Sequence, residues 1–239
     1  MPSPNNPYTT MQKNAYAHAA SQWSLSNRDP VVGTFDAHNA WPDYELLFTG
    51  MTDLAQKTGL DFGCGPGRNL VTFGQRFQRL DGVDLSETNL VNAKRWLVAN
   101  GRDASSSTLY LCNGIDLAGI PSASYDVVMS TICFQHICVY EIRYGYLREF
   151  FRVLKPGGVL TIQMGYGSPS PMTVDYYANK YDATATNRGC DTEVKHTSQL
   201  EGDLTSLGFT DFTYVLRPPG PGDCHPNWIF FQATKPVGA

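Results

Sequence analysis

Three glycines, spaced every second residue, follow an apolar segment in the stretch LDFGCGPGRN, residues 60–69. Glycine adopts positive φ angles and lets a backbone or a ligand approach closely, so this stretch predicts a sharp turn from a strand into a helix. Such a turn can hold a nucleotide, hold a phosphate, or only redirect the chain. The sequence around the turn separates these three uses.

Short apolar segments alternate with helical periods from about residue 57 onward. These segments predict strands at 57–62, 79–85, 107–112, 125–131, 159–166, 209–216 and 227–235. Helices are expected between them. Ser86 caps one, Ser198 and Glu201 form a capping box at another, and KPGG ends a third at 141–154. The alternation predicts a parallel sheet with helices on both faces and a final antiparallel pair of strands.

The chain is expected to form one domain with two additions. Residues 1–56 precede the alternation and predict an N-terminal helical lid, with Tyr16 and Trp23 on one helix face. Residues 57–239 form the expected core, and 166–196 leave it from a strand end as an insert on the substrate side. Ligands of open α/β sheets bind beyond the carboxyl ends of the strands, so the tyrosines of this insert predict a pocket roof. The alternative is ordinary packing of a surface loop.

The glycine turn matches neither common phosphate-binding motif. The dinucleotide motif G-x-G-x-x-G needs a glycine where Arg68 stands, and a P-loop needs G-K-[ST]. Asp84, in GVDLS at the end of the second expected strand, is placed to accept two hydrogen bonds from a ribose diol. The residues therefore predict a site for a nucleoside that has a ribose and lacks a diphosphate.

Composition argues against several classes of protein. The net charge is −4 and no long run of Lys or Arg occurs, so we expect no nucleic-acid partner. The first residues do not form a secretory signal, and no apolar stretch approaches the roughly 18–20 residues of a membrane span, so no membrane partner is expected. Six cysteines without a CxxC pair predict reduced thiols in the cytoplasm and no metal, with metal ligation or disulfides as the alternative. The sequence does not indicate an oligomeric state.

Four motifs in order carry a family resemblance. LDFGCGPG, GVDLS, SYDVVMSTICFQHI and RVLKPGG, over roughly residues 57–165, resemble the class I S-adenosylmethionine-dependent methyltransferases. The resemblance implies an α/β, Rossmann-like fold with a seven-stranded, mostly parallel sheet whose last strand is antiparallel. It also implies S-adenosyl-L-methionine as cofactor and transfer of its methyl group to a nucleophile.

The resemblance further implies a cofactor site, position by position. Asp84 would bind the ribose hydroxyls, and Leu85 would lie against the adenine. Asn113 stands where the family often has an Asp, and its side-chain oxygen can also accept from the adenine amino group. Asn69 would reach the cofactor carboxylate, with a helix-surface position as its alternative. The full set is Asp61, Gly63, Cys64, Gly65, Asn69, Asp84, Leu85, Asn113, Gly114, Ser130 and Thr131.

Methyl transfer from a sulfonium is an in-line displacement, so positioning supplies much of the catalysis, about 7–11 kcal/mol. A general base is needed only when the acceptor is protonated at the working pH. His136 directly follows the fourth expected strand and is the predicted base. The alternative is a structural histidine, and His225 is a second candidate for the base.

The predicted acceptor contacts are Tyr16, Trp23, Gln135 and Tyr166. Arg28, Arg143 and Arg188 are candidates to clamp an anionic acceptor, although Arg143 is expected on a solvated helix face. Cys64 is expected to be a small packing residue rather than a nucleophile.

The leading interpretation is a methyltransferase acting on an O or N nucleophile of a small molecule. One alternative is a non-catalytic protein that binds the same cofactor. Another is a nucleic-acid methyltransferase, but STIC stands where base amino-methylating members carry an N/D-P-P-Y/F motif. The identity of the acceptor is not encoded in a motif.

Overall fold

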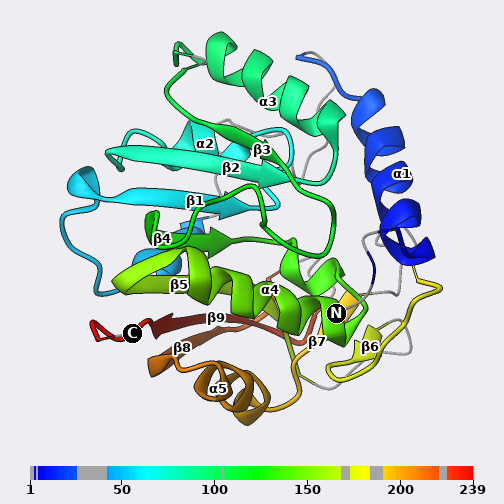
Figure 1. Ribbon diagram of the computed structural model, residues 1–239, viewed down its shortest axis with the longest axis vertical. Coiled ribbons are helices and arrows are strands. Elements are labelled where there is room, and N and C mark those ends of the chain that lie inside the picture. Colours follow the sequence, from blue (N-terminus) through cyan, green and yellow to red (C-terminus); the bar gives the residue numbers. More distant parts are fainter. Residues whose placement is uncertain are drawn as a thin grey trace.

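A computed structural model describes residues 3, 5–25, 42–103, 105–167, 173–183, 191–220 and 225–238 (Figure 1). The helices are α1 Pro7–Ser21, α2 Arg68–Phe73, α3 Glu87–Ala99, α4 Tyr140–Val153 and α5 Thr197–Ser206. Short 3-10 helices are η1 Pro42–Phe48, η2 Leu54–Gln56 and η3 Phe134–His136. The strands are β1 Thr58–Phe62, β2 Arg79–Asp84, β3 Leu109–Leu111, β4 Tyr125–Ser130, β5 Leu154–Tyr166, β6 Thr173–Asp175, β7 Asp191–Glu193, β8 Thr210–Arg217 and β9 Asn227–Thr234.

The main sheet has seven strands in the order β3-β2-β1-β4-β5-β9-β8. The first five run parallel, while β9 pairs antiparallel with both β5 and β8. In this register Phe62 lies beside Val83, so β1 and β2 end together at one edge. The prediction of a mostly parallel seven-stranded sheet with an antiparallel last strand is confirmed.

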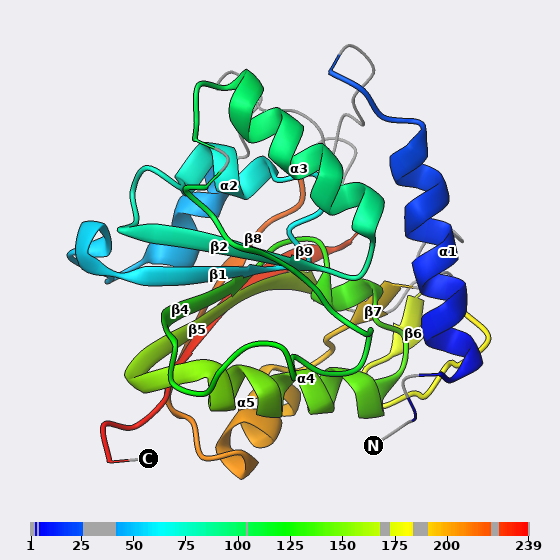
Figure 2. The ribbon, with the colours of Figure 1, turned by 45° about the horizontal axis from the view of Figure 1, so that its top comes forward.

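Strand alternation divides the core between the two faces of the sheet. Leu60 and Phe62 belong to the cluster under α4 and α5, whereas Val127 and Met129 belong to the cluster with η1, α2 and α3. Figure 2 shows α2 and α3 above the sheet and α4 and α5 below it. Because both faces are covered, the central strands are apolar on both sides, as expected for a parallel sheet.

The capping box predicted from Ser198 and Glu201 is wrong. α5 begins at Thr197, so its N-cap is His196, whose side chain accepts from the backbone of Gln199 while the Gln199 side chain accepts in return. Gln199 Oε1 accepts from the His196 backbone N–H at 3.1 Å. The box therefore lies two residues earlier in the chain than the Ser-x-x-Glu pattern indicated.

Helix α1 lies across the carboxyl ends of the parallel strands, toward which β1 and β2 point in Figure 1. Tyr8 Oη accepts from the Cys138 backbone N–H at 2.8 Å, which ties α1 to the loop after β4. Gln12 Nε2 donates to the Ala183 carbonyl at 2.9 Å, and Asn92 Nδ2 of α3 donates to the Ala20 carbonyl at 3.1 Å. These three anchors place the described part of the expected lid directly over the sheet edge. The division into a lid and a core stays a prediction.

The glycine turn between β1 and α2 has three positive φ angles, 70° at Gly63, 51° at Gly65 and 90° at Gly67. A Cβ on Gly63 would come within 2.0 Å of Cys133 Sγ, whereas a Cβ on Gly65 would meet no atom within 4 Å. Gly63 is therefore needed for the close approach of the β1 and β4 ends. Gly65 is needed only for its backbone conformation.

We expect Gly63→Ala to destabilise the fold much more than Gly65→Ala. The left-handed conformation costs about 1–2 kcal/mol at either position, and overlap with Cys133 adds about 1–3 kcal/mol at Gly63 alone. Urea unfolding of both variants measures the difference. In a Cys133→Ala background the cost of Gly63→Ala should fall, because the colliding sulfur is gone. Equal losses for the two single variants would contradict this account of the turn.

Candidate functional site

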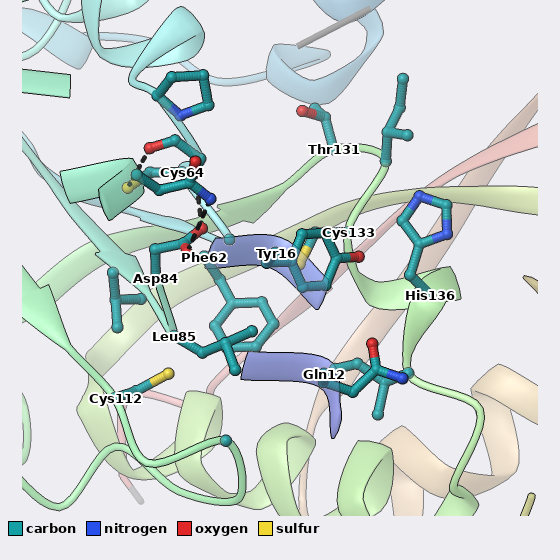
Figure 3. Close-up of a pocket in the computed structure, with 18 of the residues that line it drawn as sticks. Gln12, Tyr16, Phe62, Cys64, Asp84, Leu85, Cys112, Thr131, Cys133 and His136 are labelled. Atoms are coloured by element: carbon teal, nitrogen blue, oxygen red, sulfur yellow. Dashed lines mark hydrogen bonds between the residues drawn. The ribbon is translucent and has the colours of Figure 1, made fainter. Parts of the chain in front are cut away.

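A pocket with a cavity volume of about 140 Å³ lies where the carboxyl ends of β1, β2 and β4 face α1 (Figure 3). Its lining comes from α1, the β1–α2 turn, the β2–α3 turn, and the loops after β3 and β4. Of the residues predicted for the site, the lining includes Tyr16, Trp23, Gly63, Cys64, Gly65, Asn69, Asp84, Leu85, Gly114, Thr131 and His136. The structure thus gathers segments that are far apart in the sequence around one cavity.

Asp84, the last residue of β2, links two of these turns. Its Oδ2 accepts from the Gly65 backbone N–H at 2.9 Å, and its Oδ1 accepts from the Ser86 N–H at 2.8 Å and from Asn89 Nδ2 at 3.1 Å. Burial raises the pKa of Asp84, while these hydrogen bonds to the carboxylate act in the opposite direction. The carboxylate is therefore held in place from both sides, next to the space that the glycines leave open.

Asp61 lies beneath the pocket rather than in its lining. Asn69 Nδ2 donates to Asp61 Oδ1 at 3.1 Å and to Thr131 Oγ1 at 3.0 Å, so Asn69 stands between the buried acid and the cavity. Burial raises the pKa of Asp61 to about 7, although the Asn69 hydrogen bond and the positive charge of Arg68 oppose the shift. Any effect of Asp61 on a ligand passes through Asn69 and Thr131, which do line the pocket.

Arg68 is a lining residue that sequence reasoning did not assign to the site. Its side chain is almost fully buried, Nη2 donates to Tyr44 Oη at 2.9 Å, and its guanidinium lies 5.1 Å from the centre of the Tyr44 ring. A guanidinium fixed in this way can receive a carboxylate. The signal in the sequence that could have identified Arg68 is its position directly after the third glycine. In the sequence analysis this position counts only against a dinucleotide site.

Leu85, Cys112 and Gly114 line the pocket at the ends of β2 and β3. Asn113, predicted to accept from an adenine, lies outside the lining. Its Oδ1 accepts from the backbone N–H groups of Ile115 at 2.9 Å and Asp116 at 3.0 Å. The side chain of Asn113 thus closes its own loop, which is a common use of Asn in turns.

Three further predicted residues, Ser130, Gln135 and Tyr166, lie outside the lining. Ser130 Oγ donates to the Phe62 carbonyl at 3.0 Å, which joins β4 to β1. Gln135 Oε1 accepts from the Gly165 N–H at 3.0 Å and is buried. Tyr166, the last residue of β5, packs against the core. The first two are bound to neighbouring strands, a role that the sequence did not reveal.

His136 and Tyr16 both point into the pocket from opposite elements, η3 and α1 (Figure 3). His225, the second candidate base, is 3% exposed and outside the lining. It lies with Nδ1 3.8 Å from Glu193 Oε1 and its ring centre 4.7 Å from that of Trp228. The geometry therefore gives His136, and not His225, access to the cavity.

The expectation that Arg143 sits on a solvated helix face is wrong. Arg143 is fully buried and donates to the carbonyls of Ile137 and Tyr176 and to Thr192 Oγ1. Burial lowers the pKa of its guanidinium. Leu147, one turn later, is also buried, so both belong to the inner stripe of α4. Arg28 and Arg188 lie outside the described residues.

Comparison with known proteins agrees with this geometry. Residues 60–162, from β1 into β5, match the family described as "Methyltransferase domain". Over these residues, which are less than half of the chain, the protein resembles the class I S-adenosylmethionine-dependent methyltransferases.

Two relatives of the chain have names that give different methyl acceptors. The chain is 31% identical over 146 residues to the ribosomal RNA small subunit methyltransferase C of Hahella chejuensis, covering 59% of this chain and 41% of that protein. It is 28% identical over 146 residues to the malonyl-[acyl-carrier protein] O-methyltransferase of Salmonella typhimurium, covering 61% and 50%. The chain thus spans half or less of the length of these two relatives.

Among solved structures, the fold is similar to phosphoethanolamine N-methyltransferase 2 of Haemonchus contortus in complex with phosphomonomethylethanolamine and S-adenosylhomocysteine. The TM-score is 0.63 at 22% identity, over 83% of this chain and 54% of that chain. In the part of the chain that the structure describes, no helix is both long and apolar enough to cross a membrane.

Three cysteines of the pocket, Cys64, Cys112 and Cys133, are free thiols. Burial raises the pKa of each of them, which keeps the thiols neutral. The thiolate is the nucleophilic form of cysteine, so these residues act as packing groups in the wall. This agrees with the packing role expected for Cys64.

Replacing Asp61 by Asn should remove a pH dependence of stability. The folded-state pKa of about 7 lies above the ordinary value near 4, so the carboxyl binds its proton more tightly in the folded state. Its contribution is fully present below about pH 4 and is lost as the pH rises through about 7. Urea unfolding from about pH 5 to about pH 8 should therefore show the wild type losing stability relative to Asp61→Asn.

Asp103→Asn is the matched control, because Asp103 is exposed and its pKa is lowered by hydrogen bonds from Ser105. Its contribution is lost only on acidification below this range, so the difference between wild type and Asp103→Asn should stay flat. If the difference in stability between wild type and Asp61→Asn also stays constant with pH, the account of a buried carboxyl with a raised pKa is contradicted.

Proposed function

We propose that this protein transfers a methyl group from S-adenosylmethionine to an O or N nucleophile of a small molecule by in-line displacement. The observation that carries the proposal is one continuous cavity. It joins the glycine turn and Asp84 at one end to His136 and α1 at the other. A cofactor and an acceptor held at these two ends share one enclosed space, as displacement requires.

The cofactor portions follow from the order of groups around the pocket. Asp84 binds the ribose diol at the end of β2, and Leu85 and Gly114 flank the adenine. At the other side of the glycine turn, Arg68 pairs with the cofactor carboxylate and Asn69 stands beside the amino-acid portion. This arrangement directs the sulfonium toward the loop after β4, which carries His136.

His136 acts as general base in this proposal. It takes a proton from the acceptor as the acceptor's lone pair attacks the methyl carbon, and the carbon–sulfur bond breaks toward sulfur. The sulfonium is already an activated leaving group, so the remaining task of the protein is alignment. A base at this place is consistent with acceptors that are protonated at neutral pH.

A nucleic-acid acceptor is the second candidate, because one relative is a ribosomal RNA methyltransferase. Three observations favour the small molecule. The chain reads STIC after β4, without the N/D-P-P-Y/F pattern of base amino-methylating members, and its net charge is −4. α1 also covers the edge of the sheet where a flipped base would enter.

A cytoplasmic location belongs to the same proposal, since four described cysteines are free thiols.

Two substitutions should separate binding from turnover. Asp84→Asn removes the charge that faces the ribose and should weaken S-adenosylmethionine binding by about 10-fold or more, a loss of about 1.4 kcal/mol or more. His136→Gln should leave that affinity within about 2-fold and lower kcat by roughly 10²- to 10⁴-fold. Calorimetry gives the affinities, and release of S-adenosylhomocysteine in a screen of small-molecule acceptors gives kcat.

His18→Gln serves as the control, because His18 is exposed on α1 and absent from the pocket lining. It should change neither quantity. Full turnover by His136→Gln would contradict the base role. Cofactor binding without transfer to any small molecule would favour the non-catalytic or nucleic-acid alternative.

A further inference from the structure

The acceptor end of the pocket combines aromatic rings with one imidazole. It is formed by Tyr8, Gln12, Tyr16 and Trp23 of the α1 segment and by Cys133 and His136 after β4. Tyr8, Gln12 and Tyr16 recur every fourth residue, so they share one face of α1. Figure 3 shows the ring of Tyr16 in the middle of the cavity. A flat ring that lies against these aromatic side chains would gain edge-to-face or stacked contacts.

Within the part of the pocket lining that the structure describes, the charged side chains lie at the end opposite these aromatic rings. Arg68 and Asp84 belong to the glycine turn and the end of β2, where the cofactor binds. Burial raises the pKa of Cys133 and keeps that thiol neutral. The acceptor end therefore has, among the described residues, no carboxylate for an ammonium and no guanidinium or ammonium for a phosphate or carboxylate. An anionic acceptor would therefore find no opposite charge among the described residues at this end.

The chemistry of the base narrows the acceptor further. A carboxylate acceptor needs no base, and an aliphatic alcohol is a much weaker acid than a phenol, so the transfer of its proton to an imidazole is less favourable. A phenol has a pKa near 10, and an ordinary imidazole has a pKa near 6.5, which suits transfer of the proton as the oxygen attacks. An uncharged aromatic ring that carries a hydroxyl can pack against the aromatic lining and can give its proton to His136.

We propose that the acceptor is a neutral phenol, methylated on its hydroxyl oxygen, and this rests on the proposed function. The phenol proton passes to a ring nitrogen of His136. The phenolic oxygen forms the new bond to the methyl carbon, the carbon–sulfur bond breaks, and its electron pair stays on sulfur. The products are an aryl methyl ether, neutral S-adenosylhomocysteine and an imidazolium that returns its proton to water.

Four probes compare the acceptor classes: p-cresol, benzylamine, p-toluate and phosphoethanolamine. Calorimetric binding of each probe, to the protein with and without S-adenosylhomocysteine, decides the acceptor class independently of turnover. We expect p-cresol to bind at least about 10-fold more tightly than the other three. Equal or tighter binding of benzylamine, p-toluate or phosphoethanolamine would overturn the phenol proposal.

Turnover with S-adenosylmethionine then tests the proposed function itself. Transfer to p-cresol supports both proposals. Tight p-cresol binding without transfer supports the acceptor class and overturns the methyltransferase function. No preference for p-cresol, with transfer to another probe, overturns the acceptor class alone.

Tyr16 provides the residue-level test. Tyr16→Leu removes the ring and should raise KM for p-cresol by about 5-fold or more, whereas Tyr16→Phe keeps the ring and should stay within about 2-fold. His18→Gln, on an exposed position of the same helix, should leave KM unchanged. An equal rise in KM for Tyr16→Leu and Tyr16→Phe would contradict recognition through the ring.

Discussion

The Asp84 carboxylate is the interaction on which the rest of the pocket depends. It accepts from Gly65 of the β1–α2 turn and from Ser86 and Asn89 of the β2–α3 turn. A buried carboxylate without such donors would be costly, so the fold must bring both turns to this one group. Once they meet there, the glycines leave an open space beside a fixed negative charge, and that space is suited to a ribose.

The acceptor side depends on anchors from outside the sheet. Tyr8 of α1 holds the loop after β4 through the Cys138 N–H, and Arg143 of α4 binds the Ile137 carbonyl of the same loop. His136, at the end of η3, directly precedes both anchored residues. The position of the proposed base is thus fixed jointly by α1 and α4. A change in either helix would shift its alignment, to which displacement rates are sensitive.

Local pattern predicted the sheet, its order of elements and the glycine turn, because these depend on alternation, glycine conformation and a strand-end acid. The prediction from local pattern was wrong where tertiary contacts determine the direction in which a side chain points. Ser130 and Gln135 stand next to lining residues but turn to the backbone of β1 and β5. Arg143 is expected on the surface because a charged residue on a helix usually is, yet it is buried against the Ile137 carbonyl just before α4 and the distant Tyr176 carbonyl.

The most direct test of the central claim is calorimetric titration of the purified protein with S-adenosylmethionine, with NADH as the control ligand. The account predicts micromolar binding of S-adenosylmethionine and no binding of NADH, because the turn beside Asp84 suits a ribose and lacks the third glycine of a pyrophosphate clamp. Binding of NADH, or of neither ligand, would contradict it.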